Sequence, residues 1–237
     1  CSEVQAELVE SASLGDSSSV MSSIQQAGQG SACLSDAEAG DSSRRRRRLL
    51  QLAPLATRQQ LRTDMVQLLG QLGSSLVPAP APVSQFLGAL SSAALGPLEE
   101  LTVDSAMRAL SVASSVAGMV QSLRIAMDAS TAQSLIDVVA RAEAVAARDH
   151  GNMAGLPSSA RAAIAESRAA LANMSRAVAA DISCGESPTE MTASTSAGSV
   201  AVAPLRLMVQ RLCSGASAQR EMVLPLAEGG SHTARVS

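Results

Sequence analysis

The sequence predicts a mainly α-helical fold, a helical bundle of stacked antiparallel helices that leads into a partial antiparallel β-sandwich at the C-terminus. Through most of the chain, start signals rich in Ser, Thr and Asp precede apolar residues at helical spacing, and these segments end at Gly or Pro. The apolar residues are mainly Ala, Leu, Val and Met, which suit helices that approach one another closely. After Cys184-Gly185, β-branched residues in near-alternation are typical of strands.

Residues 1–53 predict a helical hairpin followed by an arginine-rich linker. The first helix ends at Gly15, and Asp16 or Ser17 is expected to cap the second. The polar stretch 34–43 is expected to be a linker. The apolar stripes consist of Val4, Leu8 and Ala12 in the first helix and of Val20, Met21, Ile24 and Ala27 in the second.

Residues 54–183 predict a helical subdomain. Pro54 breaks any helix that precedes it, and a clean apolar stripe after it predicts a new one. Residues 73–84 are rich in Pro, Ala and Ser and predict an extended connector, with a short helix expected over 84–94. The stripe consists of Leu61, Met65, Leu68, Leu69 and Leu72.

Longer helices complete this subdomain. Gly96-Pro97 marks a break, and Thr102 or Asp104 is expected to cap the helix that follows. The expected bounds of the next helices are Ser130 to near His150-Gly151, and residues 157–181 with Pro157 in the first position.

Residues 184–237 predict the start of a β subdomain that the chain leaves incomplete. Apolar residues alternate along Leu205, Leu207 and Val209, and residues 221–226 form another apolar run of strand length, in which Pro225 suggests an edge or a strand end. Because the chain begins at Cys and stops inside this pattern, we expect it to be a fragment of a longer protein.

The composition disfavours several classes of function. The chain has no Trp, no Tyr and one Phe, so it lacks the aromatic walls of many ligand clefts and the stacking platforms of RNA readers. Its net charge is −3, although five of its arginines stand in one run, so we expect no nucleic-acid partner. We also expect no cofactor and no metal, and no segment here is long and apolar enough to span a membrane.

No group of side chains stands at catalytic spacing, so we expect no enzyme. The acids Asp36, Glu38, Glu99, Glu100 and Asp128 are scattered along the chain. His150 follows Arg148 and Asp149 at a helix end, where a cation is stabilised by the helix dipole, and His232 lacks the context of an autocleavage site.

The run of arginines near position 46 has three interpretations. It matches a nuclear-localisation or nucleic-acid patch, or a site for proteases that cleave after paired arginines. We favour a solvated lead-in to the leucines that follow, because adjacent cations repel one another. The run consists of Arg44, Arg45, Arg46, Arg47 and Arg48.

The cysteines leave two interpretations open. Cys1, Cys33, Cys184 and Cys213 are either buried free thiols or one or two disulfides of an oxidising compartment. Asn173-Met174-Ser175 is an N-glycosylation sequon, which favours the extracellular interpretation.

Four stretches carry a resemblance to a known family. The stretch LEELTVDSAMRALSVASSVAG resembles helices of the receptor-for-egg-jelly (REJ) module in polycystin-type proteins, and also the helical half of the adjacent GAIN domain. SVAVAPLRLMVQRLCSG is similar to the first strands of the GAIN β-sandwich, so residues 54–183 resemble its α subdomain and 184–237 the start of its β subdomain. The terminal cleavage motif of a GAIN domain is absent from the sequence. The remaining stretches are AELVESASLGDSSSVMSSIQQA and TRQQLRTDMVQLLGQLGSSL.

The resemblance implies a non-enzymatic structural and adhesive segment of a large membrane glycoprotein, on the extracellular face of a cell or ciliary membrane. It implies protein partners, such as a polycystin-type channel subunit or an extracellular filament protein of the kind that forms flagellar mastigonemes. Under this hypothesis Cys184 pairs with Cys213, and Cys1 with Cys33. The alternative is an intracellular helical scaffold with free cysteines.

Overall fold

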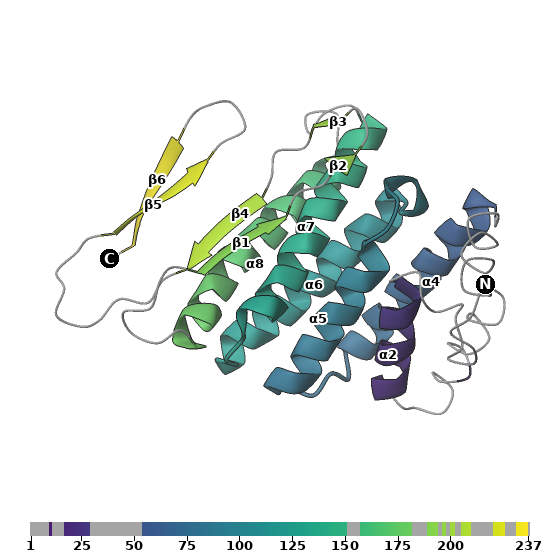
Figure 1. Ribbon diagram of the computed structural model, residues 1–237, viewed down its shortest axis with the longest axis horizontal. Coiled ribbons are helices and arrows are strands. Elements are labelled where there is room, and N and C mark those ends of the chain that lie inside the picture. The colour runs from purple at the N-terminus through teal and green to yellow at the C-terminus, as the bar shows by residue number, and fades with distance from the viewer. Residues whose placement is uncertain are drawn as a thin grey trace, which may run out of the picture.

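A computed structural model describes residue 10 and residues 17–28, 54–150, 157–181, 189–193, 196–197, 200–201, 205–209, 220–225 and 231–236. Most of these residues are helical, as the sequence predicts (Figure 1). The helices are α2 (Ser17–Gly28), α4 (Leu55–Gly73), α5 (Pro80–Ala94), α6 (Val103–Leu123), α7 (Ala129–His150) and α8 (Ser158–Asp181), with the 3-10 helix η1 (Leu98–Glu100) between α5 and α6.

The helices pack in two layers, and the chain alternates between them. One layer contains α2, α5 and α7, and the other contains α4, α6 and α8. Each helix packs on its neighbours within its layer and on the helices before and after it in the opposite layer. Figure 1 shows the resulting row, with α2 towards one end and α8 towards the other. Such stacking buries a continuous core between the layers, although no helix covers its own apolar face alone.

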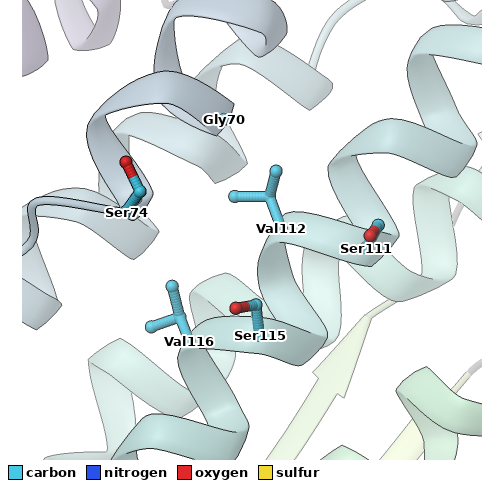
Figure 2. A pocket seen from close by; sticks show the side chains of 7 residues that line it. Gly70, Ser74, Ser111, Val112, Ser115 and Val116 are labelled. Atoms are coloured by element: carbon cyan, nitrogen blue, oxygen red, sulfur yellow. The ribbon is translucent and has the colours of Figure 1, made fainter.

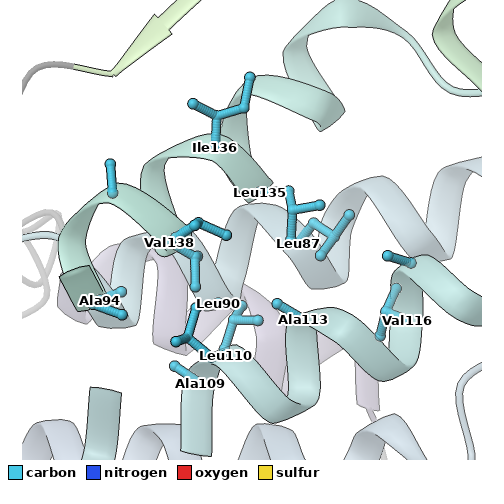
Figure 3. Packing of buried hydrophobic residues seen from close by; sticks show 14 of the residues in the cluster. Leu87, Leu90, Ala94, Ala109, Leu110, Ala113, Val116, Leu135, Ile136 and Val138 are labelled. Carbon is cyan, nitrogen blue, oxygen red and sulfur yellow. The ribbon is translucent and has the colours of Figure 1, made fainter. Parts of the chain in front are cut away.

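Small side chains let the helices approach one another closely. Leu87 and Leu90 of α5 interleave with Leu110 and Ala113 of α6 and with Leu135 of α7 (Figure 3). Alanines take many of the positions between these larger residues, so backbones can approach where they lie. The only phenylalanine, Phe86, is fully buried in this core. The buried alanines of α5, α6 and α7 are Ala89, Ala93, Ala94, Ala106, Ala109, Ala113, Ala117, Ala132, Ala140, Ala142, Ala144 and Ala146.

The described strands form antiparallel pairs in which each strand has one partner. β1 (Thr189–Ala193) pairs with β4 (Leu205–Val209), β2 (Ser196–Ala197) with β3 (Val200–Ala201), and β5 (Arg220–Pro225) with β6 (Ser231–Val236). The expected alternation is confirmed in β4, where Leu207 and Val209 are buried and Met208 is 55 % exposed. The β1–β4 pair lies on α7 and α8 (Figure 1). These pairs do not make up the expected β-sandwich.

Two expected helix boundaries are wrong, both for reasons of local chemistry. The connector expected over 73–84 is shorter, because α5 already begins at Pro80. Proline is well tolerated in the first turn of a helix, where the missing N–H would have no partner within the helix. Helix α7 begins at Ala129, because the side chain of Asp128 accepts a hydrogen bond from the Thr131 N–H at 2.7 Å and so caps it. Asp128, expected to be one of the scattered acids, therefore has a structural role.

The choice between two caps for α6 is settled by the structure. The Thr102 hydroxyl accepts a hydrogen bond from the Ser105 N–H at 3.2 Å, so Thr102 is the N-cap. Asp104 lies in the first turn and forms an exposed ion pair with Arg108, with 3.0 Å between the two side chains. The expected ends of α7 at His150 and of α8 at residue 181 are confirmed.

Candidate functional site

The largest gathering of ionisable side chains in the described part of the chain surrounds residues 95–101, which connect α5 to α6. Arg62 reaches this connection from α4 and is buried. Its Nη1 donates to the carbonyl oxygens of Ala93 at 2.9 Å and Leu95 at 2.5 Å, and more weakly to that of Ser92 at 3.5 Å. These carbonyls belong to the C-terminal end of α5 and lack partners within the helix. Arg62 therefore caps α5 from a different helix.

Glu100 is the acceptor at the centre of this group. It is only 7 % exposed, and its Oε2 accepts from Arg62 Nε at 2.9 Å while its Oε1 accepts from Arg58 Nη1 at 2.5 Å. Arg58 and Arg62 stand four residues apart on α4, so both project from one face of that helix. The sequence predicts Glu100 only as one of several scattered acids, and it gives no sign of these arginine partners, which lie about 40 residues away along the chain.

Helix α7 holds the same connection from the other side. Arg148 donates to the backbone carbonyl oxygens of Leu98 and Leu101, and it also contacts the carboxylate of Asp149. From α4, Gln59 Nε2 donates to the carbonyl oxygen of Glu99 at 2.7 Å. His150 lies exposed in the last turn of α7, where the sequence places it. The connection is thus bound by donors from a helix that precedes it and from one that follows it.

Arg141 of α7 also faces this group, but it has a different environment. It is 9 % exposed, and its Nε has no hydrogen-bond partner among the described residues. Burial lowers the pKa of Arg141, and the nearby charges of Arg62 and Arg148 lower it further, whereas Glu99 and Glu100 oppose this change. An arginine keeps its charge even so, because its ordinary pKa is far above neutral.

A second polar contact joins α7 to α8. The buried carboxylate of Glu143 accepts two parallel hydrogen bonds from Arg168, one from Nε at 2.7 Å and one from Nη2 at 2.8 Å. This bond raises the pKa of the Arg168 guanidinium. Ser167 of α8 hydrogen-bonds Ser114 of α6 at 3.0 Å, so α8 is attached to both of its neighbours by polar side chains as well as by apolar packing.

Gln133 of α7 connects the helices to the β1–β4 pair. Its Nε2 donates to Asp137 Oδ1 at 2.8 Å and to the carbonyl oxygen of Thr192 in β1 at 3.0 Å. Burial raises the pKa of the Asp137 carboxyl, and the hydrogen bond from Gln133 partly offsets this rise. This bridge fixes the position of β1 against the outer face of α7.

A shallow groove between α4 and α6 contains no ionisable group (Figure 2). Its volume is about 250 Å³, and it is lined by glycines of α4 and by serines and valines of α6. Such a lining offers hydroxyls and small apolar surfaces, but none of the acid, base or nucleophile pairs that catalysis requires. The lining residues are Gly70, Gly73, Ser74, Ser111, Val112, Ser115 and Val116.

Most of the site residues expected from the sequence lie outside the described part of the chain. This holds for the four cysteines and for the arginine run. Asn173 lies within helix α8, and His232 lies in β6 opposite Leu224 of β5. Among the residues that the structure describes, no three His, Cys, Asp or Glu side chains come together as metal ligands. None of the described helices is both long enough and apolar enough to cross a membrane.

The residues that sequence reasoning missed are Arg62, Arg141 and Glu100. A weak signal exists for Arg62 alone, because Arg58 and Arg62 stand one helical turn apart on α4 and so share one face of it. Comparison with known proteins adds no relative: no protein-family model matches the chain, and no curated protein or solved structure is significantly similar to it.

Proposed function

We propose that the chain is a non-enzymatic structural scaffold whose stacked helices support contacts with other proteins. The observation that carries this proposal is the alternation of helices between two layers. Proteins built in this way are elongated and present long surfaces, and their function depends on shape and stiffness. The side chains that converge around Glu100 support it as well, because Arg62 and Arg148 among them hold backbone carbonyls in place.

The specific form of the proposal places this scaffold in the ectodomain of a polycystin-like surface protein. Its support is the resemblance over residues 98–118, which fold as η1 and most of α6. In this form the partner is a polycystin-type channel subunit or an extracellular filament protein, and only segments beyond this chain would contact the membrane.

A second candidate is an intracellular scaffold with free cysteines, and one observation favours it. Asn173 lies inside helix α8, whereas a glycosylation acceptor is expected in a surface loop. A glycan on Asn173 would exclude the cytosol, so its presence or absence separates the two candidates.

The test is peptide mass spectrometry on unreduced protein from a secretory and from a cytosolic expression host. The extracellular form predicts that the secreted protein carries a glycan at Asn173 and disulfides Cys184–Cys213 and Cys1–Cys33. An Asn173→Gln variant controls for glycan at any other position. Secreted, folded protein with an unmodified Asn173 and four free thiols would contradict the extracellular form and support the intracellular scaffold.

The scaffold itself is tested separately, by small-angle X-ray scattering, which measures the shape of the particle in solution. The alternating layers predict a particle whose maximum dimension exceeds that of a sphere of equal mass. This dimension should stay the same when the groove residue Ser111 is changed to Ala. A compact spherical particle would contradict the scaffold proposal in both of its forms.

A further inference from the structure

Helix α7 buries two charged side chains, and only Glu143 has an ion-pair partner among the residues that the structure describes. Every residue from Val138 to Ala146 is buried, and this stretch contains Arg141 and Glu143. Glu143 is held by the two hydrogen bonds from Arg168. Residues two apart on a helix face different directions, so Arg141 cannot share this pairing. A buried charge is costly unless it is paired, and Arg141 lacks the partner that Glu143 has.

The surroundings of Arg141 do not supply that partner among the described residues. The two oxygens of Glu100 pair with Arg58 and with Arg62, and neither pairs with Arg141 in the described structure. Glu99 is exposed, and its charge acts on Arg141 without forming an ion pair. Asp149 contacts Arg148 instead.

Positive charge is therefore in excess at this point of the fold. The arginines that gather here are Arg58, Arg62, Arg141 and Arg148, and they outnumber the carboxylates Glu99, Glu100 and Asp149. The Nε of Arg58 is a second buried donor without a partner among the described residues. Two unsatisfied guanidinium nitrogens in one cluster are unusual, since buried donors are nearly always hydrogen-bonded.

We propose that this cluster is an anion site, in which the guanidinium group of Arg141 binds a single oxyanion, either a carboxylate or a phosphate, in the positive field of Arg62 and Arg148. A guanidinium group presents its donors in a planar fork, and that fork matches the two oxygens of a carboxylate or a phosphate. A bound oxyanion would supply the acceptor that Arg141 lacks and would balance the excess charge.

A simpler role for Arg141 makes the opposite prediction. The aliphatic part of an arginine can pack against the core while the guanidinium tip reaches water at the surface. In that case Arg141 needs no anion, and anions at constant ionic strength leave the stability of the protein unchanged.

The test measures the thermal unfolding midpoint at pH 7 in potassium phosphate and in potassium acetate, each against potassium chloride of equal ionic strength. With an anion at ten times its dissociation constant, we expect a saturable rise of roughly 3–6 °C for a chain of this size. A rise with phosphate alone or acetate alone supports the site and identifies the class of anion, whereas no rise with either overturns it.

Matched variants assign any effect to this cluster. Arg141→Met keeps the aliphatic stem and removes the charge, so it should abolish the rise, while Arg108→Met, at an exposed pair on α6, should leave the rise unchanged. An equal rise in Arg141→Met and wild type overturns the proposal. Should Arg141→Met fail to fold, the arginine Nε–Hε signals of the wild type provide a second readout. The Arg141 signal should shift on addition of phosphate or acetate, and a signal that stays in place with both anions overturns the proposal.

Discussion

Gly96 and Arg62 occupy adjoining space at the corner where α5 leads into η1. A Cβ atom built on Gly96 would lie 2.0 Å from Arg62 Nη2, closer than any non-bonded contact allows. Gly96 also has a φ angle of +144°, a conformation that is essentially restricted to glycine. The fixed place of Arg62, which depends on its bonds to Glu100 and to the end of α5, is therefore possible only because residue 96 has no side chain.

Replacing Gly96 with alanine should destabilise the protein by about 2–4 kcal/mol, because the backbone strain and the displacement of Arg62 add together. Urea unfolding gives the free energy directly. Gly118→Ala is the matched control, since a Cβ at Gly118 in α6 meets no atom within 4 Å. This control should gain about 0.5–1 kcal/mol of stability from helix propensity. Equal effects of both substitutions would show that the Gly96 corner is not constrained.

Glu100→Gln should cost about 3–5 kcal/mol, because it leaves the cations of Arg58 and Arg62 beside a neutral acceptor in a buried site. Glu99→Gln at the exposed neighbouring position should change the unfolding free energy by less than about 0.5 kcal/mol. The comparison is made by chemical denaturation of both variants at pH 7. A cost below 1 kcal/mol for Glu100→Gln would mean that the cluster contributes little to stability.

Gly28→Ala should loosen α2 from α5, because the new Cβ would lie 2.1 Å from the Ser92 carbonyl oxygen. Backbone atoms cannot yield as a flexible side chain can, so we expect a loss of roughly 1–3 kcal/mol. Hydrogen exchange of the α2 amides should accelerate more than that of α6 or α7. Gly70→Ala provides the contrast, since its Cβ would make an ordinary contact of 3.5 Å with Val112 and partly fill the groove between α4 and α6. Unchanged exchange in α2 would contradict close packing at Gly28.

Asp128 should make the stability depend on pH through its role as the cap of α7. Hydrogen bonds from Thr131 and Ser130 hold the pKa of its carboxyl below the ordinary value of 3.8. The stabilisation is therefore fully present above pH 3.8 and is lost as pH falls through the lower pKa of the folded state. At pH 7 Asp128→Ala should cost about 1 kcal/mol, and Asp128→Asn, which still caps, should cost less. In urea unfolding between pH 7 and pH 3, the unfolding free energy of the wild type should approach that of Asp128→Asn at the acidic end.

Asp137 should make the stability depend on pH in the opposite direction to Asp128. Burial raises the pKa of its carboxyl above 3.8, so its favourable contribution is present below pH 3.8 and is lost as pH rises through the higher pKa of the folded state. Asp137→Asn should therefore be slightly more stable than the wild type at pH 7, by less than about 1 kcal/mol, and this advantage should vanish in acid. An advantage that grows in acid would contradict this assignment.

The helices could be predicted from the sequence because their signals are local. Apolar spacing located α4, α6, α7 and α8, and Thr102 was one of the two caps that the sequence offered for α6. The alternation of Leu207 and Val209 with Met208 predicted β4 for the same reason. The sheet itself was not predictable at this level, since the pairing of β1 with β4 joins residues across a connection that carries no register signal.

The arginine cluster escaped sequence analysis because its meaning depends on residues far apart along the chain. Arg62 and Glu100 look like ordinary solvent-facing charges when each is viewed among its neighbours in sequence. Only the folded layers bring α4, the 95–101 connection and α7 together and remove these charges from water. The Asp128 cap of α7 is a local feature that the sequence could have predicted. It was missed because Ser130 is an equally good N-cap residue type for the start of that helix.

The two connections that flank α5 should differ in how freely they can change over evolution. Residues 74–79 mainly satisfy their own helix end, with Ser74 and Ser75 bonded to the last carbonyls of α4, and Val77 is 61 % exposed, so added residues there can loop out into solvent. Residues 95–101 are bound from α4 and from α7 at once, so a single inserted residue would separate acceptors from donors on both sides. Natural length variation between the helices of this protein should therefore accumulate before α5 and be nearly absent after it.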